Sequence, residues 1–252
     1  MLIPDWPAPG NVRALCTTRS GGISRAPYES FNLGDHVGDA PQDVAANRAR
    51  LQQEAGARPV FMQQVHGAAV AELDALTPDG TVADGSTTTA SGVACTMMVA
   101  DCLPVLFTDE RGERVAAAHA GWRGLAGGVL EQTFKRFEAA APVGRAQAAI
   151  KVIAWLGPCI GPRAFEVGGE VKAAFEAEAP GAARCFVPGA GEGKWLADLP
   201  ALARQRLLAM GVDAVYGNDG SDAWCTVNNS SQFFSYRRDA VTGRFAALVW
   251  KL

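Results

Sequence analysis

The sequence has little of what marks several large classes of protein. Its 252 residues include 23 lysines and arginines against 26 acidic residues, and the basic residues form no cluster. This argues against a nucleic-acid binder, because such proteins usually carry a basic stripe or patch. No apolar run is long enough to span a bilayer, and the first residues lack the basic and apolar segments of a secretory signal. We therefore expect a cytoplasmic protein with neither a nucleic-acid nor a membrane partner.

Cysteine and histidine are also sparse. The six cysteines include no CxxC pair, and the chain has three histidines. In a chain of this length such cysteines indicate reduced thiols in a cytosolic protein. Cys16 and Cys95 lie inside apolar runs, as small buried hydrophobic residues do, whereas Cys102 and Cys159 stand beside proline or glycine. The last two are therefore the cysteines that a buried structural role explains least well.

What the chain does have is enough apolar sequence for a large core. Hydrophobic residues make up 48% of it, and no repeat, linker or change of composition divides residues 1–252. The hydrophobic patterns predict strands at 12–18, 59–64, 68–73, 93–100, 103–108, 114–119, 150–156, 212–216 and 244–250. They predict helices over 41–56, from about residue 125 to 137, and over 169–178 and 198–210, with a polar turn at 84–88. One domain of mixed α and β structure is the economical interpretation.

Three residues at the ends of predicted strands form a candidate metal site. His66, Cys102 and His119 each stand where an apolar run meets glycine or proline, and active-site groups of layered α/β proteins gather at such positions. Three protein ligands with a vacant fourth position are typical of catalytic zinc. Their separations match no short zinc-finger pattern, so a satisfied structural histidine is the competing interpretation of each.

Cys102 has two possible chemical roles. As a thiolate it would be a soft zinc ligand beside the two imidazoles. Alternatively it is a nucleophile, with His119 or His66 as its base and Asp101 orienting that base. Asp101 could instead cap a turn at the end of a strand. His36 is expected to be structural or to face the substrate.

Two segments could bind an anion. The strand before His119 leads through a glycine-rich turn at 121–124 into a helix, where free backbone N–H groups can hold phosphate. A tight connection with Arg123 in a surface ion pair is the alternative. Arg237 and Arg238 follow aromatic residues and could bind an anionic or planar ligand, or form a solvated turn.

Taken together, these segments resemble the YfiH family, whose members are labelled polyphenol-oxidase or laccase-domain proteins. The resemblance covers nearly the whole chain in order. The matching segments are 17–24, 31–39, 47–48, 63–67, 83–84, 100–105, 117–124, 157–161 and 234–239. One departure is Gly85, where the family commonly has alanine, and we expect no functional consequence from it.

The resemblance implies an α+β fold, a single domain of mixed β-sheets covered by helices in α/β/β/α-like layers. It implies a zinc ion, with copper possible at the same site, held by the residues matching His66, Cys102 and His119. Members of the family are described as purine-nucleoside enzymes. Their reactions are phosphorolysis of adenosine, inosine, guanosine or methylthioadenosine, with phosphate as co-substrate, and deamination of adenosine.

For such a reaction we expect Asp101 to orient a histidine ligand. The residues expected to contact the nucleoside or phosphate are Arg19, Asn32, Arg123, Arg237 and Arg238. We expect a monomer, with small molecules as its partners.

Three other functions stay open. The older family label is copper-dependent phenol oxidation, but three histidines cannot furnish the copper centres of a multicopper laccase, whose dominant ligand is imidazole. A single copper at the site could still give weak oxidation. A metal-free cysteine hydrolase would use Cys102 and His119, and a non-enzymatic binding module would turn over no nucleoside.

Overall fold

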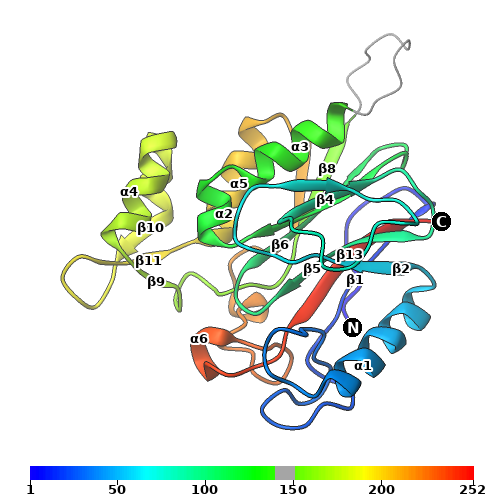
Figure 1. Cartoon of the computed structure of the whole chain (residues 1–252). Helices are drawn as coiled ribbons and strands as arrows, with labels where there is room; N and C mark the ends of the chain where they lie inside the picture. The colour runs from blue at the N-terminus through cyan, green and yellow to red at the C-terminus, as the bar shows by residue number, and fades with distance from the viewer. Residues whose placement is uncertain (140–150) are drawn as a thin grey trace.

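The computed structural model describes residues 1–139 and 151–252 (Figure 1). The first of its sheets has four strands in the order β1-β13-β5-β2. These strands are β1 (Val12–Cys16), β13 (Phe245–Lys251), β5 (Val93–Val99) and β2 (Arg58–Phe61). The β2–β5 pair is parallel and the other two pairs are antiparallel. All of β5 is buried, as its nearly unbroken apolar sequence predicts for a strand covered on both faces.

The second sheet has six strands in the order β12-β8-β6-β7-β4-β3. They are β12 (Ala214–Gly217), β8 (Val152–Leu156), β6 (Leu103–Asp109), β7 (Val115–Ala120), β4 (Gly85–Thr88) and β3 (Val70–Glu72). The outer pairs β12–β8 and β3–β4 are parallel, and the inner pairs are antiparallel. The predicted strand over 150–156 is confirmed from residue 152, and residue 150 lies outside the described residues.

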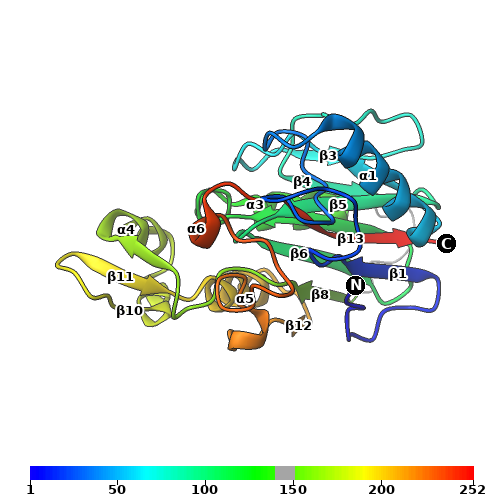
Figure 2. The ribbon, with the colours of Figure 1, turned by 90° about the horizontal axis from the view of Figure 1, so that it is seen from below.

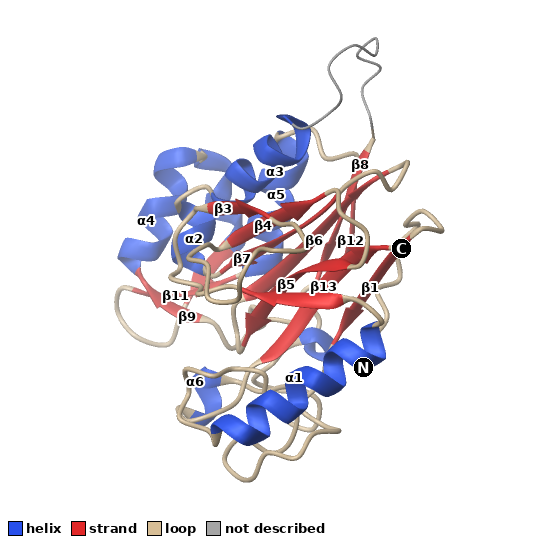
Figure 3. Ribbon diagram, turned by 45° about the vertical axis from the view of Figure 1, so that its right-hand side comes forward, coloured by secondary structure: helices blue, strands red, loops and turns tan. Residues whose placement is uncertain are grey.

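Helices cover the outer faces of both sheets (Figure 3). Helix α1 (Pro41–Ala55) packs Leu51 against the four-stranded sheet, where Leu248 and Trp250 are buried. On the six-stranded sheet lie α2 (Trp122–Ala126), α3 (Val129–Ala139) and α5 (Leu199–Ala209). A third apolar cluster fills the space between the sheets, where Met97 and Trp155 meet. The predicted α+β fold with α/β/β/α layers is thus confirmed.

A small third sheet projects from the side of these layers (Figure 2). Its order is β10-β11-β9, formed by β10 (Phe186–Pro188), β11 (Lys194–Ala197) and β9 (Glu166–Gly168). Helix α4 (Gly169–Glu178) follows β9 directly and agrees with the predicted helix. Two 3-10 helices (Pro180–Cys185 and Asp222–Trp224) and the short α6 (Tyr236–Asp239) complete the described elements. The sequence patterns did not predict this sheet, since its strands have three or four residues each.

Two other predictions need correction. The segment 84–88 is not a turn: from Gly85 on it is the fully buried β4. The helix predicted from about residue 125 is two helices, because the chain leaves α2 at Gly127 and Gly128 adopts a left-handed φ of 88°. Helix α1 ends as predicted at Gly56, whose φ of 64° suits a glycine cap.

The route of the chain between the sheets places the candidate site. It crosses from the four-stranded to the six-stranded sheet between β2 and β3, and again between β5 and β6. The first crossing carries His66 and the second carries Cys102, while His119 lies within β7. Among the described helices, none has the length and apolar composition of a membrane span.

Candidate metal centre

His66 is an exposed residue on a firmly held loop. Its φ is +60°, an uncommon conformation for a residue other than glycine. The carboxylate of Asp84 accepts hydrogen bonds from three successive backbone N–H groups, those of Val65, His66 and Gly67, at 3.1, 2.9 and 2.7 Å. Because Asp84 is fully buried, this arrangement fixes the loop to the interior and leaves the imidazole of His66 outside.

The same carboxylate orients His119. The Nδ1 atom of His119 lies 2.8 Å from Oδ1 of Asp84, and the backbone N–H of His119 donates to the carbonyl of Asp84 at 2.7 Å. An ionised carboxylate only accepts hydrogen bonds, so Nδ1 carries a proton and Nε2 faces the cluster. Burial opposes the positive charge, but the charge of Cys102 and the hydrogen bond to Asp84 outweigh it and raise the pKa of His119 to about 9. Nε2 therefore presents its lone pair to a metal once its proton is released. Burial opposes ionisation of Asp84, but the hydrogen bonds from His119 and the loop outweigh it and hold its pKa below the usual value.

Cys102 brings a sulfur atom to the two imidazoles. Its Sγ lies 3.6 Å from Nε2 of His66, and the two histidine rings meet edge to face at 4.8 Å between centroids. One ligand atom from each of the three residues lies within 4.8 Å of the others. Burial would raise the pKa of the Cys102 thiol, but the imidazoles of His119 and His66 lower it to about 6. The sulfur is thus ready to ligate as a thiolate.

The residues around this cluster fit a bound metal ion. A Cβ atom on Gly121 would lie 2.8 Å from Sγ of Cys102 and 3.0 Å from Cδ2 of His66. Gly121 therefore leaves the space in which the donor atoms converge. Two imidazoles and one thiolate suit zinc, and they also suit copper. A histidine ligand whose other ring nitrogen is held by a carboxylate is the usual arrangement at metal sites, and Asp84 supplies that carboxylate.

Asp101 holds the backbone around Cys102 rather than a histidine. Its φ is +93°, and its carboxylate accepts from Oγ1 of Thr226 at 2.5 Å and from the backbone N–H of Arg237 at 2.6 Å. Its carbonyl accepts from the N–H of Ile160 at 2.9 Å. The orienting role that the sequence assigned to Asp101 therefore falls to Asp84. Asp84 begins a polar segment whose composition predicts a turn, so the sequence around it does not indicate this role.

Of the arginines expected to contact substrate, Arg19 and Arg238 are held by main-chain carbonyls. Arg19 donates to Glu29 and Ser230 and lies over the ring of Phe234. Arg238 forms an ion pair with Asp239 and donates to three carbonyls, those of Thr226, Val227 and Phe233. Both guanidinium groups thereby fasten the loops that surround the cluster.

The other three expected contacts lie in different settings. Asn32 is fully buried, and its amide bonds to Gly34, Asp39 and the N–H of Arg244. Arg123 is exposed and lies over its neighbour Trp122. Arg237 is exposed and donates from Nη1 to the carbonyl of Glu166 at 3.1 Å. The structure thus brings Arg237 to Asp101, beside Cys102, and gives Asn32 a role inside its own loop.

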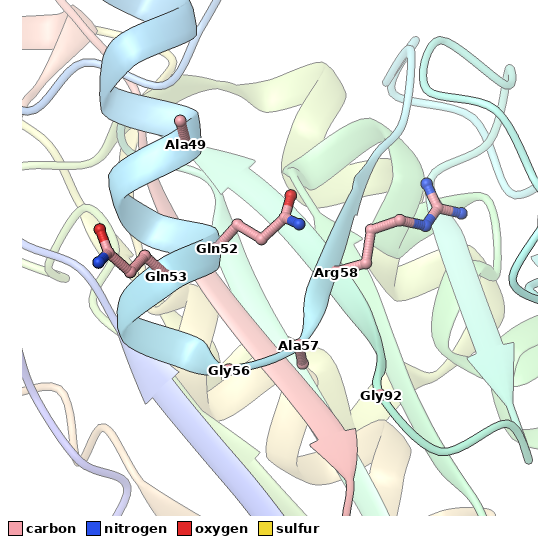
Figure 4. Close-up of a pocket in the computed structure, with 7 residues that line it drawn as sticks. All are labelled: Ala49, Gln52, Gln53, Gly56, Ala57, Arg58 and Gly92. Carbon is pink, nitrogen blue, oxygen red and sulfur yellow. The ribbon is translucent and has the colours of Figure 1, made fainter.

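A separate surface pocket lies between the end of α1 and β2 (Figure 4). Its lining includes none of the three cluster residues. Its one charged lining side chain, Arg58, donates from Nη2 to the carbonyls of Asp74 and Thr77. Its lining contains no histidine, cysteine or carboxylate, so the pocket offers no comparable chemistry.

Comparison with known proteins shows the family of the chain. Residues 13–252 match the family described as multi-copper polyphenol oxidoreductase laccase. The chain belongs to this family. A Pseudomonas aeruginosa protein named purine nucleoside phosphorylase PA4543 is 52% identical over 250 residues, which are 99% of this chain and 97% of that protein. Purine nucleoside phosphorylase YfiH of Escherichia coli is 46% identical over 252 residues, 99% of this chain and 98% of its own.

Solved structures share the fold. Neisseria meningitidis protein NMB0706 has a TM-score of 0.88 and 50% identity, covering 99% of this chain and 98% of that one. Bacillus licheniformis YfiH has a TM-score of 0.83 at 27% identity, covering 96% and 93%. The resemblance to the YfiH family seen in the sequence motifs is therefore confirmed.

Proposed function

We propose that this protein is a purine nucleoside phosphorylase with a metal centre formed by His66, Cys102 and His119. The observation that carries the proposal is the convergence of two imidazoles and a thiol, oriented by Asp84. The names of the relatives supply the substrate class. We propose adenosine, inosine, guanosine and methylthioadenosine as substrates and inorganic phosphate as co-substrate.

In this reaction a phosphate oxygen forms a bond to C1′ of the ribose. The bond between C1′ and N9 of the purine breaks, and its electron pair leaves with the base, which takes up a proton. The products are the free purine and ribose 1-phosphate, or 5-methylthioribose 1-phosphate when the substrate is methylthioadenosine. The protein must therefore hold an anion and a nucleoside together and exclude water, which would otherwise hydrolyse the same bond.

The chain's own residues prepare the site for this task. Asp84 keeps the proton of His119 on Nδ1, so that Nε2 faces the cluster, and fixes the loop of His66. Gly121 leaves room between Cys102 and His66. We propose zinc as the ion, held by His66, Cys102 and His119, and when bound it would supply a Lewis acid. The same donor chemistry supports adenosine deamination as a second activity, since zinc deaminases use histidine and cysteine ligands.

One specific observation favours a different function. Asp84, His119 and Cys102 follow one another in hydrogen-bond order, as in a nucleophilic cysteine triad. A metal-free thiol hydrolase would use the same residues and would be indifferent to chelators. Phenol oxidation by a multicopper centre is disfavoured, because three histidines cannot furnish its ligands.

The first experiment is elemental analysis of the parent protein, Cys102→Ala and Cys185→Ala. Cys185 is a matched control, because both thiols are free and partly buried. We expect near-stoichiometric zinc in the parent and in Cys185→Ala, and none in Cys102→Ala. The parent and Cys185→Ala should convert inosine to hypoxanthine and ribose 1-phosphate, and only when phosphate is present. Full turnover after chelation, or free ribose as the product, would overturn the proposal and favour the thiol hydrolase.

A further inference from the structure

Arg244 lies where the second strand crossing begins. It precedes β13, and the pairing of Phe245 with Val99 places it opposite Ala100, two residues before Cys102. Its backbone is fixed on both sides. Its N–H donates to Oδ1 of Asn32 at 2.8 Å, and its carbonyl accepts from Leu33 at 3.0 Å. His66, Cys102 and Arg244 therefore lie next to strand ends at the same end of the four-stranded sheet.

The aliphatic part of the Arg244 side chain is also restricted in position. A Cβ on Gly34 would lie 2.8 Å from Cγ of Arg244, so only glycine at this position leaves space for the aliphatic part of the arginine side chain. From the guanidinium, Nη1 donates to the carbonyls of Thr242 and Gly243, both at 3.1 Å. Asn32 and Gly34 thus both position the side chain of Arg244.

The other edge of the guanidinium is free. Within residues 1–139 and 151–252, Nε and Nη2 of Arg244 have no hydrogen-bond partner, and no carboxylate forms an ion pair with it. The charge lies within electrostatic range of Cys102 and Asp101. Asp101 accepts no hydrogen bond from those donors; its two carboxylate oxygens accept from Thr226 and Arg237.

This free edge distinguishes Arg244 from Arg238 and Arg19, whereas the exposed Arg237 shares it, since only its Nη1 donates to carbonyl groups. Nε and Nη2 of Arg238 pair with Asp239, and Nη2 also reaches the carbonyl of Phe233. Nε and Nη1 of Arg19 donate to Glu29 and Ser230. A guanidinium that presents Nε–H and an Nη2–H side by side matches two oxygens of a phosphate group.

We propose that Arg244 binds the inorganic phosphate co-substrate through Nε and Nη2. The proposal rests on the phosphorylase function proposed above and names the residue that holds its anion. Phosphate bound there would lie beside Cys102, where the nucleoside must also bind for its C1′ to be attacked. Of the five contacts expected from the sequence, Asn32 would then contribute indirectly, by fixing the backbone of Arg244.

The test compares Arg244→Gln, Arg244→Lys and Arg13→Gln with the parent. Arg13 is the matched control, because it is an exposed arginine whose Nη1 likewise donates to two nearby carbonyls. The measurements are the KM for phosphate, the KM for inosine, the Kd of inorganic phosphate by calorimetry, zinc content and thermal melting. The calorimetric Kd gives a readout that does not depend on turnover.

We expect Arg244→Gln to raise the KM and Kd for phosphate about tenfold to a hundredfold, the effect of losing a hydrogen bond to a charged group. Its KM for inosine and its zinc content should change little, and Arg13→Gln should match the parent. Arg244→Lys keeps the charge without the paired donors and should give an intermediate value. It also keeps the proposal testable if the glutamine variant does not fold.

The two proposals fail in different ways. If the parent turns over nucleosides without any dependence on phosphate, the phosphorylase function is wrong. If the parent depends on phosphate and both Arg244 variants keep its KM and Kd, the assignment of Arg244 is wrong and the function stands.

Discussion

Replacing Asp84 by asparagine tests how the two histidines are positioned. Oδ1 of Asp84 accepts from His66 N–H and His119 Nδ1, and Oδ2 accepts from Val65 and Gly67. In asparagine an NH₂ group replaces one of these two oxygens. It would face two hydrogen-bond donors and could accept from neither. Hydrogen bonds to a charged group contribute about 1.5–3 kcal/mol each, so losing two costs about 3–6 kcal/mol of unfolding free energy.

The same substitution disturbs the tautomer of His119. An amide N–H facing Nδ1 favours the ring form with its proton on Nε2, which removes the lone pair that would ligate a metal. Loss of such a partner typically lowers metal affinity about 10-fold to 100-fold. For Asp84→Asn we therefore expect weaker zinc binding by competition with a chelating dye, together with a melting temperature lower by roughly 10 °C or more.

Asp79→Asn is the control for this experiment. Asp79 is an exposed residue on the preceding loop and accepts one backbone hydrogen bond, from Phe61. We expect that variant to bind zinc as the parent does. If Asp84→Asn keeps both the zinc affinity and the melting temperature of Asp79→Asn, then the carboxylate does not position the histidines as argued here.

Three further substitutions test other parts of the structure. Gly121→Ala should lower zinc content while the protein remains folded by circular dichroism, because the new methyl group would meet Sγ of Cys102; full zinc occupancy would contradict this. Phe107→Ala removes a fully buried ring and should cost about 3–5 kcal/mol in denaturant unfolding without changing zinc content. Burial raises the pKa of Asp198, so its ionisation should lower stability as pH rises above 3.8. Asp198→Asn, which keeps an acceptor for Ala201 at the helix cap, should lack that fall when melting is followed from pH 3 to pH 7.

The sequence patterns predicted the buried strands and the three residues that the structure brings together, and the resemblance to the family implied the layers. Apolar runs such as 93–99 form buried strands wherever they occur, and His66, Cys102 and His119 stand at the ends of such runs. The patterns failed at β4, where Gly85, Ser86 and two threonines have the composition of a turn. The two threonine hydroxyls donate to carbonyls distant in the sequence: Thr87 to that of Val115 and Thr88 to that of Leu73.

Gly85 shows why such a segment cannot be interpreted locally. A Cβ there would meet Oγ1 of Thr133 on α3 and would lie 2.9 Å from Cγ2 of Val70 on β3. The need for glycine comes from two elements distant in the sequence. Asp84 and Arg244 were missed for the same reason, since their partners lie 17 to 35 residues away for Asp84 and 212 for Arg244.

The positions of His66 and Cys102 on the two crossings between the sheets have a mechanical consequence. A ligand shared by these residues and His119 would act as a cross-link between the two layers, in addition to the hydrogen bonds that Asp84 accepts from the loop of His66. Ligand binding would then stabilise the contact between the two sheets at this end. When the ligand binds, amide hydrogen exchange should slow most at the ends of β5 and β6 that are next to Cys102. The far ends of the same strands should exchange as before.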